Sequence, residues 1–453
     1  MLKDVILGQK AELEQTFNEP YVEREAKPFS LTHNLIKVII GPRRAGKSFF
    51  VIHSLRKQGS FGYANFDNEE LTQIKEYDEI ISEINQAYDN PKVIFFDEIQ
   101  NLPKWELFVN RLQRQGFNIV VTGSNSNLLS KELATHLTGR HMPTNILTFS
   151  FSEFLVAKKI DTKKVPTTKI KELFFEYLQK GGYPETIVKD LDSKQYLGVL
   201  FESILYKDII KRYNTRKGKE IEKLALFLLS NSGSEFSHTS TSSAIGLKSH
   251  LTAQKYLGYL EEAYLFFTVN NFSFKTKQQA QSKKIYCFDN GLITAKAYQS
   301  SQNLGKLLEN VVAIYLKRQE IENKINFYYW KNQQREEVDF VVKEGLKVTQ
   351  LIQVCYDPSK SETKKREVRA LIKAGQDTGC KNLLVITNDY EAKEEHEWFG
   401  AKASIQFIPA WKWLLETDSW EESRQVEKFR EKIKEQRGAK NSFYKATMDP
   451  LYP

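Results

Sequence analysis

The chain has 453 residues and a mass of 52.7 kDa, and 41% of its residues are hydrophobic, 12% aromatic and 27% charged. This composition excludes an intrinsically disordered chain, and at roughly 150 residues per domain the length predicts about three folding units. The net charge of +9 is compatible with polyanion binding but is also common in proteins that bind none.

Cysteine and histidine are too sparse in this sequence to predict a disulfide framework or a zinc site. The three cysteines, Cys287, Cys355 and Cys380, are widely spaced, which predicts neither a disulfide framework nor a Cys-type zinc site. The seven histidines show no metal-ligand spacing. The N-terminus lacks the apolar stretch of a secretory signal, and no later stretch approaches the length of a membrane span. We therefore expect a cytoplasmic protein with no membrane contact.

The first 150 residues alternate between strand and helix patterns. Residues 1–30 resemble an acidic amphipathic helix that ends at Pro28 and Ser30. Short apolar strands are then expected at 35–40, 62–66, 92–98 and 117–124, with amphipathic helices between them. Alternation at these lengths predicts an α/β unit with a parallel sheet.

The rest of the chain divides into four further segments. Residues 151–215 carry apolar residues at helical spacing and predict a helical lid. In residues 216–300 three helices precede a two-stranded ribbon, which is the order of a winged helix. Residues 301–420 predict a compact α-β-β-β-α-β module, and residues 421–453 a charged helical tail that is partly disordered.

A phosphate-binding loop follows the first strand. The segment from Gly41 to Ser48 reads GPRRAGKS and matches G-x-x-x-x-G-K-[ST] between a strand and a helix. Glycines let backbone N–H groups surround a phosphate chain, and the following helix N-terminus favours negative charge. Lys47 is expected to reach the phosphates and Ser48 to bind Mg²⁺. The nucleotide-binding residues we expect are Gly41, Pro42, Arg43, Arg44, Ala45, Gly46, Lys47, Ser48 and Phe49.

Two acids end the apolar strand KVIFFDE and complete this site. Asp97 is expected to support Mg²⁺ and Glu98 to polarise the attacking water, because strand ends meet beside the phosphate loop in such sheets. The next strand ends in Thr122, Ser124 and Asn125, where a polar side chain would hold the same water or form an ordinary turn. No guanine-selecting motif is present, which favours ATP as the nucleotide. The sequence thus predicts an ATPase that uses ATP and Mg²⁺.

These motifs, together with FDEIQNLPKWE, TGSNSNLL, LTGR, GGYPE, YCFDNGL and GKLLENVV, resemble those of the AAA+ ATPases over nearly the whole chain. The resemblance is to the bacterial and archaeal branch that carries a C-terminal domain of unknown function. It implies a P-loop parallel sheet with a helical lid. It also implies that Asn125 or Ser124 acts as the sensor, and that Arg140 senses phosphate or is supplied to a neighbouring subunit. Arg43, Arg44, Arg111 and Arg114 compete for this role. Both a ring and a monomer remain open.

The basic residues of the winged-helix segment suggest contacts to DNA. Lys248 and Lys255 are expected on the outer face of a recognition helix whose apolar face is Leu251, Tyr256, Leu257 and Leu260. Further lysines, Lys275, Lys277, Lys283 and Lys284, are expected on the wing, where they would touch phosphates. An internal packing module with a solvated lysine loop is the alternative.

The C-terminal module resembles the PD-(D/E)xK nuclease fold. The resemblance assigns its acidic site to Glu309, Asp339 and Gln353, but Cys355 stands where that fold has its lysine. A neutral thiol cannot replace the positive charge that orients the water, unless Lys343 or Lys347 takes its place. We therefore expect a degenerate, nucleic-acid-binding or structural module ahead of an active nuclease.

Three functions remain open for ATP hydrolysis by this chain. The first is a DNA-associated machine with a role such as genome defence or mobile-element control, and it is supported by the winged-helix pattern and the basic wing. The second is a slow signalling switch that acts on protein partners. The third is an ATP-regulated, metal-dependent nuclease. Salt-dependent DNA binding, co-purifying nucleotide with negligible turnover, and metal-dependent cleavage would distinguish them.

Overall fold

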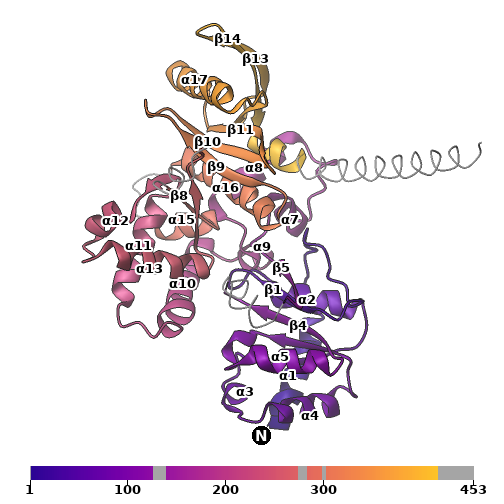
Figure 1. Cartoon of the computed structure of the whole chain (residues 1–453). Helices are drawn as coiled ribbons and strands as arrows, with labels where there is room; N and C mark the ends of the chain where they lie inside the picture. Colours follow the sequence, from indigo (N-terminus) through magenta and orange to yellow (C-terminus); the bar gives the residue numbers. More distant parts are fainter. Residues whose placement is uncertain (1, 126–138, 274–282, 298–302, 417–453) are drawn as a thin grey trace, which may run out of the picture.

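The computed structural model describes residues 2–125, 139–273, 283–297 and 303–416. The tail expected at 421–453 lies outside these ranges. Three separate β-sheets organise the described chain (Figure 1). The N-terminal sheet lies at the bottom of this view, the C-terminal sheet at the top, and the helices of the middle segment to one side.

The N-terminal sheet is parallel throughout, as the strand and helix alternation predicts. Its five strands run in the order β2-β3-β4-β1-β5. Their bounds are β1 (Ile36–Ile40), β2 (Gly62–Asn65), β3 (Val93–Asp97), β4 (Asn118–Gly123) and β5 (His141–Asn145). The strand β5 was not expected, because its sequence HMPTN lacks an apolar pattern and lies at the sheet edge. The carboxyl ends of β1, β3 and β4 meet at one edge of the sheet.

Helices cover this sheet on both faces. Their bounds are α1 (Leu2–Thr16), α2 (Lys47–Arg56), α3 (Glu69–Gln73), α4 (Tyr77–Ala87), the 3-10 turn η1 (Ile99–Asn101) and α5 (Trp105–Arg114). The expectation of one helix over residues 1–30 is wrong, since α1 ends at Thr16. Pro20 disfavours a helical conformation at Glu19, and the chain beyond it extends along the phosphate loop.

A helical segment follows, as its periodicity predicts. It consists of α7 (Phe151–Ala157), α8 (Thr167–Lys180), α9 (Pro184–Val188), α10 (Ser193–Ser203) and the π-helix η3 (Ile204–Lys211). A capping box at Ser150 and Glu153 starts α7. Gly182 separates α8 from α9 and packs directly on the chain at Phe149, because a Cβ there would lie 2.3 Å from the Phe149 carbonyl oxygen.

The middle segment contains the three expected helices and the expected ribbon. Its elements are α11 (Gly218–Ser230), β6 (Ser234–Phe236), α12 (His238–Ile245), α13 (His250–Glu262), β7 (Phe266–Asn270), β8 (Lys283–Cys287) and α15 (Asn290–Lys296). The short β6 adds a third strand in the antiparallel order β6-β8-β7. The expected apolar face of α13 is wrong at one position. Leu251 is 63% exposed, because it lies in the first turn of the helix and points away from the core.

The C-terminal segment forms a six-stranded mixed sheet of order β13-β14-β12-β11-β10-β9. Its elements are α16 (Leu304–Ile321), β9 (Asn326–Lys331), β10 (Glu337–Glu344), β11 (Lys347–Cys355), α17 (Ser361–Thr378), β12 (Leu383–Thr387), β13 (Ala392–Trp398) and β14 (Ala401–Pro409). The elements through β12 match the expected order. The hairpin of β13 and β14 was missed because β13, AKEEHEW, is charged and nowhere fully buried.

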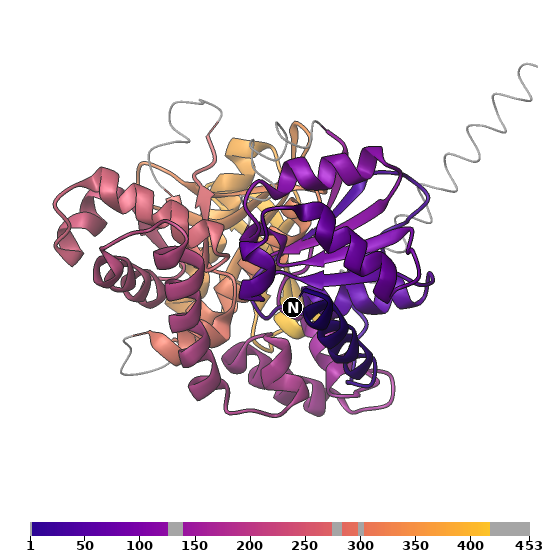
Figure 2. The same ribbon diagram turned by 90° about the horizontal axis from the view of Figure 1, so that it is seen from below.

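The hydrophobic core crosses the boundaries between the later segments. One continuous cluster of buried side chains runs from Leu147 to Leu414 and includes the helical, middle and C-terminal segments. The parallel sheet instead has a core on each face, one around Phe96 and one around Phe95. Seen from below, the sheet and its helices lie beside the middle segment (Figure 2). The helical, middle and C-terminal segments therefore form one packed body next to the parallel sheet.

Candidate functional site

The phosphate loop connects β1 to α2 in a conformation that requires glycine. Gly41 has φ 151°, and a Cβ there would lie 1.9 Å from the carbonyl oxygen of Ile146. Gly46 has φ 88° and forms the N-cap of α2. These values lie in a region that side chains rarely adopt, so the loop can wrap closely only with glycine at both positions.

The charged side chains expected at this loop are brought together. Lys47 is buried, and its Nζ donates to the carbonyl oxygen of Pro42 at 2.9 Å and lies 4.0 Å from Glu98 Oε1. The Ser48 hydroxyl donates to Asp97 Oδ1 at 2.9 Å. Burial lowers the pKa of Lys47, although Glu98 and Asp97 oppose this effect. A lysine, a hydroxyl and two carboxylates therefore meet within one small site.

Asp97 is held by hydroxyl groups on several sides. Besides Ser48, Tyr63 donates to its Oδ2 at 3.3 Å, and Thr122 also donates to Oδ1. Burial and the neighbouring charge of Glu98 raise the pKa of Asp97 to about 6. The oxygens of Ser48 and Asp97 lie 2.9 Å apart, and such a pair suits Mg²⁺, which binds through one or two carboxylates together with phosphate oxygens.

Glu98 is positioned by its backbone. Its φ of 51° is left-handed, and its N–H donates to the Thr122 hydroxyl at 3.0 Å. Gln100 donates to the Glu98 carboxylate. The expectation that Thr122 could hold the attacking water is wrong, because its fully buried hydroxyl is engaged by Asp97 and the backbone of Glu98.

A cavity of about 480 Å³ adjoins the loop. The segment before β1 and the helix α9 line it together with the loop. The lining residues outside the expected set include Glu19, Pro20, Tyr21, Val22, Arg24, Phe149, Pro184, Glu185, Val188 and Lys189. Sequence reasoning missed these residues because they are far from the motif in the chain. Of the expected set, Arg44 and Phe49 also line the cavity, and Arg44 is an exposed partner of Glu185 at 3.4 Å.

A buried ion pair fixes the segment before β1 against the loop. Arg24 Nε donates to Glu153 Oε1 at 2.8 Å, and Nη2 donates to Oε2 at 3.1 Å. The same guanidinium donates to the carbonyl oxygens of Ala45 at 2.8 Å and Leu147 at 2.6 Å. Burial would raise the pKa of Glu153, but the Arg24 charge and hydrogen bonds outweigh it and hold that pKa below its usual value.

A second ion pair joins the loop to the helical segment. Arg43 Nε donates to Asp208 Oδ2 at 2.8 Å and its Nη2 to Oδ1 at 3.1 Å. Asp208 lies on the π-helix η3, and it also accepts from Ser124 at 3.4 Å. Arg212 lies 3.8 Å from the same carboxylate. Asp208 thus contacts the phosphate loop and the end of β4 from one helix.

The two expected sensor residues are placed differently. Asn125 is buried directly after β4, at the edge of the sheet where the loop lies. Arg140 is exposed, and its carbonyl oxygen accepts from the N–H of Ile36 at the start of β1, five residues before the loop begins at Gly41. At about 3.3 Å per residue this separates it from the loop by about 17 Å along the strand. The expectation that Arg140 senses phosphate within its own chain is therefore wrong. Its role as an arginine supplied to the phosphates of a neighbouring subunit stays a prediction.

The expected DNA-contacting lysines fall into three groups. Lys248 and Lys255 are exposed at and near the start of α13, and Lys283 is half-buried on β8. Lys275 and Lys277 lie outside the described residues. Lys284 is wrong as a DNA contact, because it is 2% exposed and its ammonium is enclosed by carboxylates.

The nuclease-like residues gather at the junction of the middle and C-terminal segments. Glu309 on α16 and Asp339 on β10 both approach Lys284, whereas Gln353 on β11 accepts from the Asp339 N–H at 3.2 Å and donates to Glu367 at 2.5 Å. Burial raises the pKa of Glu309 to about 7, although Lys284 lowers it. Among the described residues, no group of His, Cys, Asp and Glu side chains is arranged to hold a metal ion.

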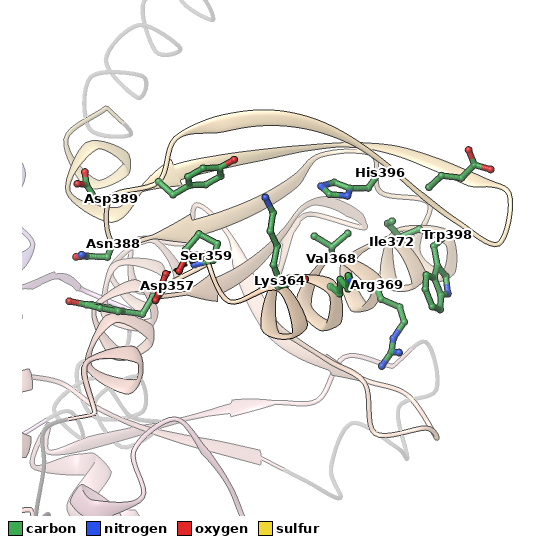
Figure 3. A pocket seen from close by; sticks show the side chains of 16 residues that line it. Asp357, Ser359, Lys364, Val368, Arg369, Ile372, Asn388, Asp389, His396 and Trp398 are labelled. Carbon is green, nitrogen blue, oxygen red and sulfur yellow. Dashed lines mark hydrogen bonds between the residues drawn. The ribbon is translucent and has the colours of Figure 1, made fainter.

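A larger cavity of about 1010 Å³ lies between α17 and the β13–β14 hairpin. Figure 3 shows Lys364 and Val368 rising from α17 toward the strand that carries His396. Lys364 donates to Glu394 of β13 at 2.7 Å, which helps to hold the hairpin over the helix. This cavity shares no residue with the phosphate site.

Comparison with protein families divides the chain into three parts. An AAA domain matches residues 33–155, and two domains of unknown function, DUF8612 and DUF4143, match residues 171–303 and 304–412. In the described part of the chain no helix is long and apolar enough to cross a membrane.

Curated relatives cover most of the chain. An uncharacterized protein of Methanocaldococcus jannaschii is 37% identical over 401 residues, which are 85% of this chain and 89% of that protein. An uncharacterized protein of Haemophilus influenzae is 35% identical over 304 residues, 63% of this chain and 75% of that protein.

Solved structures are similar at low sequence identity. A Walker-type ATPase of Pyrococcus abyssi matches with a TM-score of 0.40 and 14% identity, over 64% of this chain and 94% of that one. Cdc6p of Pyrobaculum aerophilum matches with a TM-score of 0.25 and 13% identity, over 67% of this chain and 98% of that one.

Proposed function

The chain belongs to the family of AAA-domain proteins that includes the uncharacterized Methanocaldococcus jannaschii protein, and on this premise we propose that it binds ATP with Mg²⁺ and hydrolyses it. The single observation that carries this proposal is the convergence of Lys47, Ser48, Asp97 and Glu98 at one end of the parallel sheet. These residues come from two segments about fifty positions apart, and each has the chemistry that phosphoryl transfer needs.

The cavity beside the loop has room for the remainder of the nucleotide. Tyr21 and Val22 line it from the segment before β1, and Pro184 and Val188 line it from α9. Their apolar and aromatic surfaces suit a planar base. Phosphates would then lie on the loop, where Lys47 can leave the Pro42 carbonyl oxygen and reach the negative charge. Base and phosphates would thus be held by opposite ends of the cavity.

The hydrolytic step needs one base and one metal ion. Ser48 and Asp97 would hold Mg²⁺, which neutralises charge on the phosphate oxygens. Glu98 would orient a water molecule and accept its proton as the water oxygen bonds to the terminal phosphorus. The bond from that phosphorus to the bridging oxygen breaks, and ADP and phosphate result. Asn125, buried after β4, is a candidate to hold the same water.

The test separates nucleotide binding from hydrolysis. Lys47→Ala should lose ATP binding, because it removes the buried cation at the loop. Glu98→Gln should keep ATP affinity while turnover falls by a factor of about 10² to 10⁴, the usual contribution of a positioned base. Lys57→Ala, whose side chain is 64% exposed just after α2, is the matched control and should match the wild type. Unchanged ATP affinity and turnover in both site variants would contradict the proposal.

A DNA-associated role is supported by one surface. Lys248, His250 and Lys255 are exposed on or beside the first turns of α13, and Leu251 lies among them with 63% exposure. If both lysines contact phosphates, Lys248→Ala with Lys255→Ala should reduce the slope of log affinity against log salt by about 2. Lys402→Ala, exposed on β14, is the control. No salt-dependent DNA binding by the wild type would favour the packing-module alternative.

The switch alternative uses the same ATP site. Its support is the Arg43–Asp208 ion pair, which connects the phosphate loop to the helical segment and so to the body that contains the C-terminal sheet. A switch would copurify with tightly bound nucleotide and turn over slowly whether or not DNA is present. Stimulation of turnover by DNA at low salt, lost at high salt, would instead identify a DNA-coupled machine.

A further inference from the structure

A buried lysine lies at the centre of the nuclease-like acidic cluster. Lys284 belongs to β8 in the middle segment and is 2% exposed. Its Nζ lies 3.0 Å from Glu309 Oε1, 3.0 Å from Asp339 Oδ1 and 2.6 Å from Glu337 Oε1. One ammonium therefore contacts carboxylates from α16 and β10 at the same time.

The geometry of this cluster matches the chemistry of an ammonium group. An ammonium has three N–H donors and no acceptor, and three carboxylate oxygens surround it here. The Tyr329 ring lies 5.8 Å from Nζ and adds an aromatic face. Two further donors hold these carboxylates: Tyr286 donates at 2.7 Å to Glu309 Oε1, the oxygen that Lys284 also contacts, and the Val354 N–H donates at 2.9 Å to the second oxygen of Asp339, Oδ2.

Electrostatics explains why a cation must be present. Several carboxylates buried together repel one another, and burying such charges without a counterion is costly. Glu309 and Asp339 are the two acids that the nuclease-like pattern assigns to a metal site. In this chain the charge at their meeting point is supplied by a side chain from the neighbouring segment.

We propose that Lys284 is a permanent substitute for a divalent cation, which leaves the acidic cluster of the C-terminal module unable to bind Mg²⁺ or Mn²⁺ and unable to cleave nucleic acid. The ammonium instead fastens β8 to α16 and β10 and so joins the middle segment to the C-terminal sheet. This inference is independent of ATP binding at the phosphate loop.

Two further contacts show that this junction is fixed. Phe272, just after β7, donates its N–H to the Tyr329 carbonyl oxygen at 2.6 Å, and Cys287 on β8 exchanges hydrogen bonds with the amide of Asn310 on α16. The strand β8 that carries Lys284 is therefore held to α16, and the chain after its neighbour β7 is held to β9, independently of the lysine.

Removal of the lysine is expected to open a metal site. In Lys284→Ala the carboxylates of Glu309, Glu337 and Asp339 would remain around an unfilled space, and oxygen ligands of this kind bind Mg²⁺ and Mn²⁺. The variant should unfold at a lower temperature than the wild type in EDTA, and Mn²⁺ should restore part of the difference. Lys283→Ala, the adjacent position on the same strand, is the matched control and should respond to neither.

The measurement is Mn²⁺ binding by electron paramagnetic resonance, with the full-length chain free of nucleotide so that the phosphate site contributes little. We expect no Mn²⁺ bound by the wild type at this cluster, one Mn²⁺ bound per chain by Lys284→Ala, and loss of that ion in Lys284→Ala with Asp339→Asn. A Lys284→Ala variant that folds but binds no Mn²⁺ would overturn the proposal.

Two wild-type measurements decide the question even if Lys284→Ala does not fold. Stoichiometric Mn²⁺ binding by the wild type that Asp339→Asn abolishes would overturn the proposal. So would Mn²⁺-dependent cleavage of DNA or RNA by the wild type that the same variant abolishes. A triple variant that neutralises the cluster, Lys284→Met with Glu309→Gln and Asp339→Asn, should fold without Mn²⁺ because its substitutions remove the lysine charge and two of the carboxylate charges together. If Lys47→Ala and Glu98→Gln contradicted the proposed ATPase function, the expected results for Mn²⁺ binding and nucleic-acid cleavage at the acidic cluster would stay the same.

Discussion

The Arg24–Glu153 ion pair is expected to be a major source of stability at the nucleotide cavity. Both side chains are 3% exposed, and their closest contact is 2.8 Å. Glu153 also accepts from the backbone N–H groups of Glu25 at 2.9 Å and Ser150 at 3.0 Å. Glu153→Gln would keep the shape, but it would leave the Arg24 charge buried without its partner and place an amide donor opposite another donor.

The magnitude follows from this burial. Removing one partner of a buried pair costs about 3–5 kcal/mol, because the remaining charge is uncompensated. A folding unit of about 150–250 residues loses about 2–4 °C in melting temperature per kcal/mol, so the melting temperature should fall by about 6–20 °C. Glu23→Gln is the matched control, since its pair with Lys57 is 61–64% exposed and should contribute less than about 1 kcal/mol.

The assay is thermal and urea unfolding of the wild type, Glu153→Gln, Arg24→Met and the double variant. The double variant should be more stable than the sum of the single effects predicts, because neither charge is left alone. If Glu153→Gln and Glu23→Gln lowered the melting temperature by the same small amount, the reasoning would be refuted.

The same pair predicts a pH dependence. The pKa of Glu153 is lowered from its usual 4.5 in the folded chain. Its contribution to stability is therefore fully present above pH 4.5 and is lost as the pH falls through the lower folded value. The difference in melting temperature between the wild type and Glu153→Gln should shrink in acid. A difference that stays constant down to the acid transition would contradict this assignment.

Three further substitutions test other parts of the fold. Asp208→Asn should weaken its contact to Arg43 and lower the free energy of unfolding by about 1.5–3 kcal/mol, the range for hydrogen bonds to charged groups, as measured in urea. Gly182→Ala should destabilise by a similar amount, about 1–3 kcal/mol, because its Cβ would overlap the Phe149 carbonyl oxygen. Gly258→Ala on α13 should stabilise by about 0.5–1 kcal/mol, because nothing lies within 4 Å of the added methyl group. Equal melting temperatures for the two glycine variants would contradict the packing argument.

The sequence by itself determined the local parts of this protein. The parallel strands are short, apolar and bounded by turns, so β1, β3 and β4 could be recognised directly. The phosphate loop is a continuous motif whose glycines and lysine act over eight residues. Asp97 and Glu98 were found because acids that end a buried strand lie at a known edge of a parallel sheet.

The sequence was least informative where an element has no apolar pattern. The edge strands β5 and β13 have no fully buried side chain, and their sequences, HMPTN and AKEEHEW, lack the apolar alternation by which a half-buried strand is recognised. The segment after α1 leaves helical conformation although its composition would suit a helix, because Pro20 and the contacts of Arg24 with distant residues decide its path.

Only the tertiary structure decided which distant charges meet. Arg24 and Glu153 are 129 positions apart, and Arg43 and Asp208 are 165 positions apart. Lys284, expected on an exposed wing, reaches Asp339 55 positions later. No spacing rule encodes such pairs, because they depend on how whole segments pack around a shared core. The local chemistry of the phosphate loop could therefore be predicted from sequence, whereas its connections to the rest of the chain, and the state of the acidic cluster, could not.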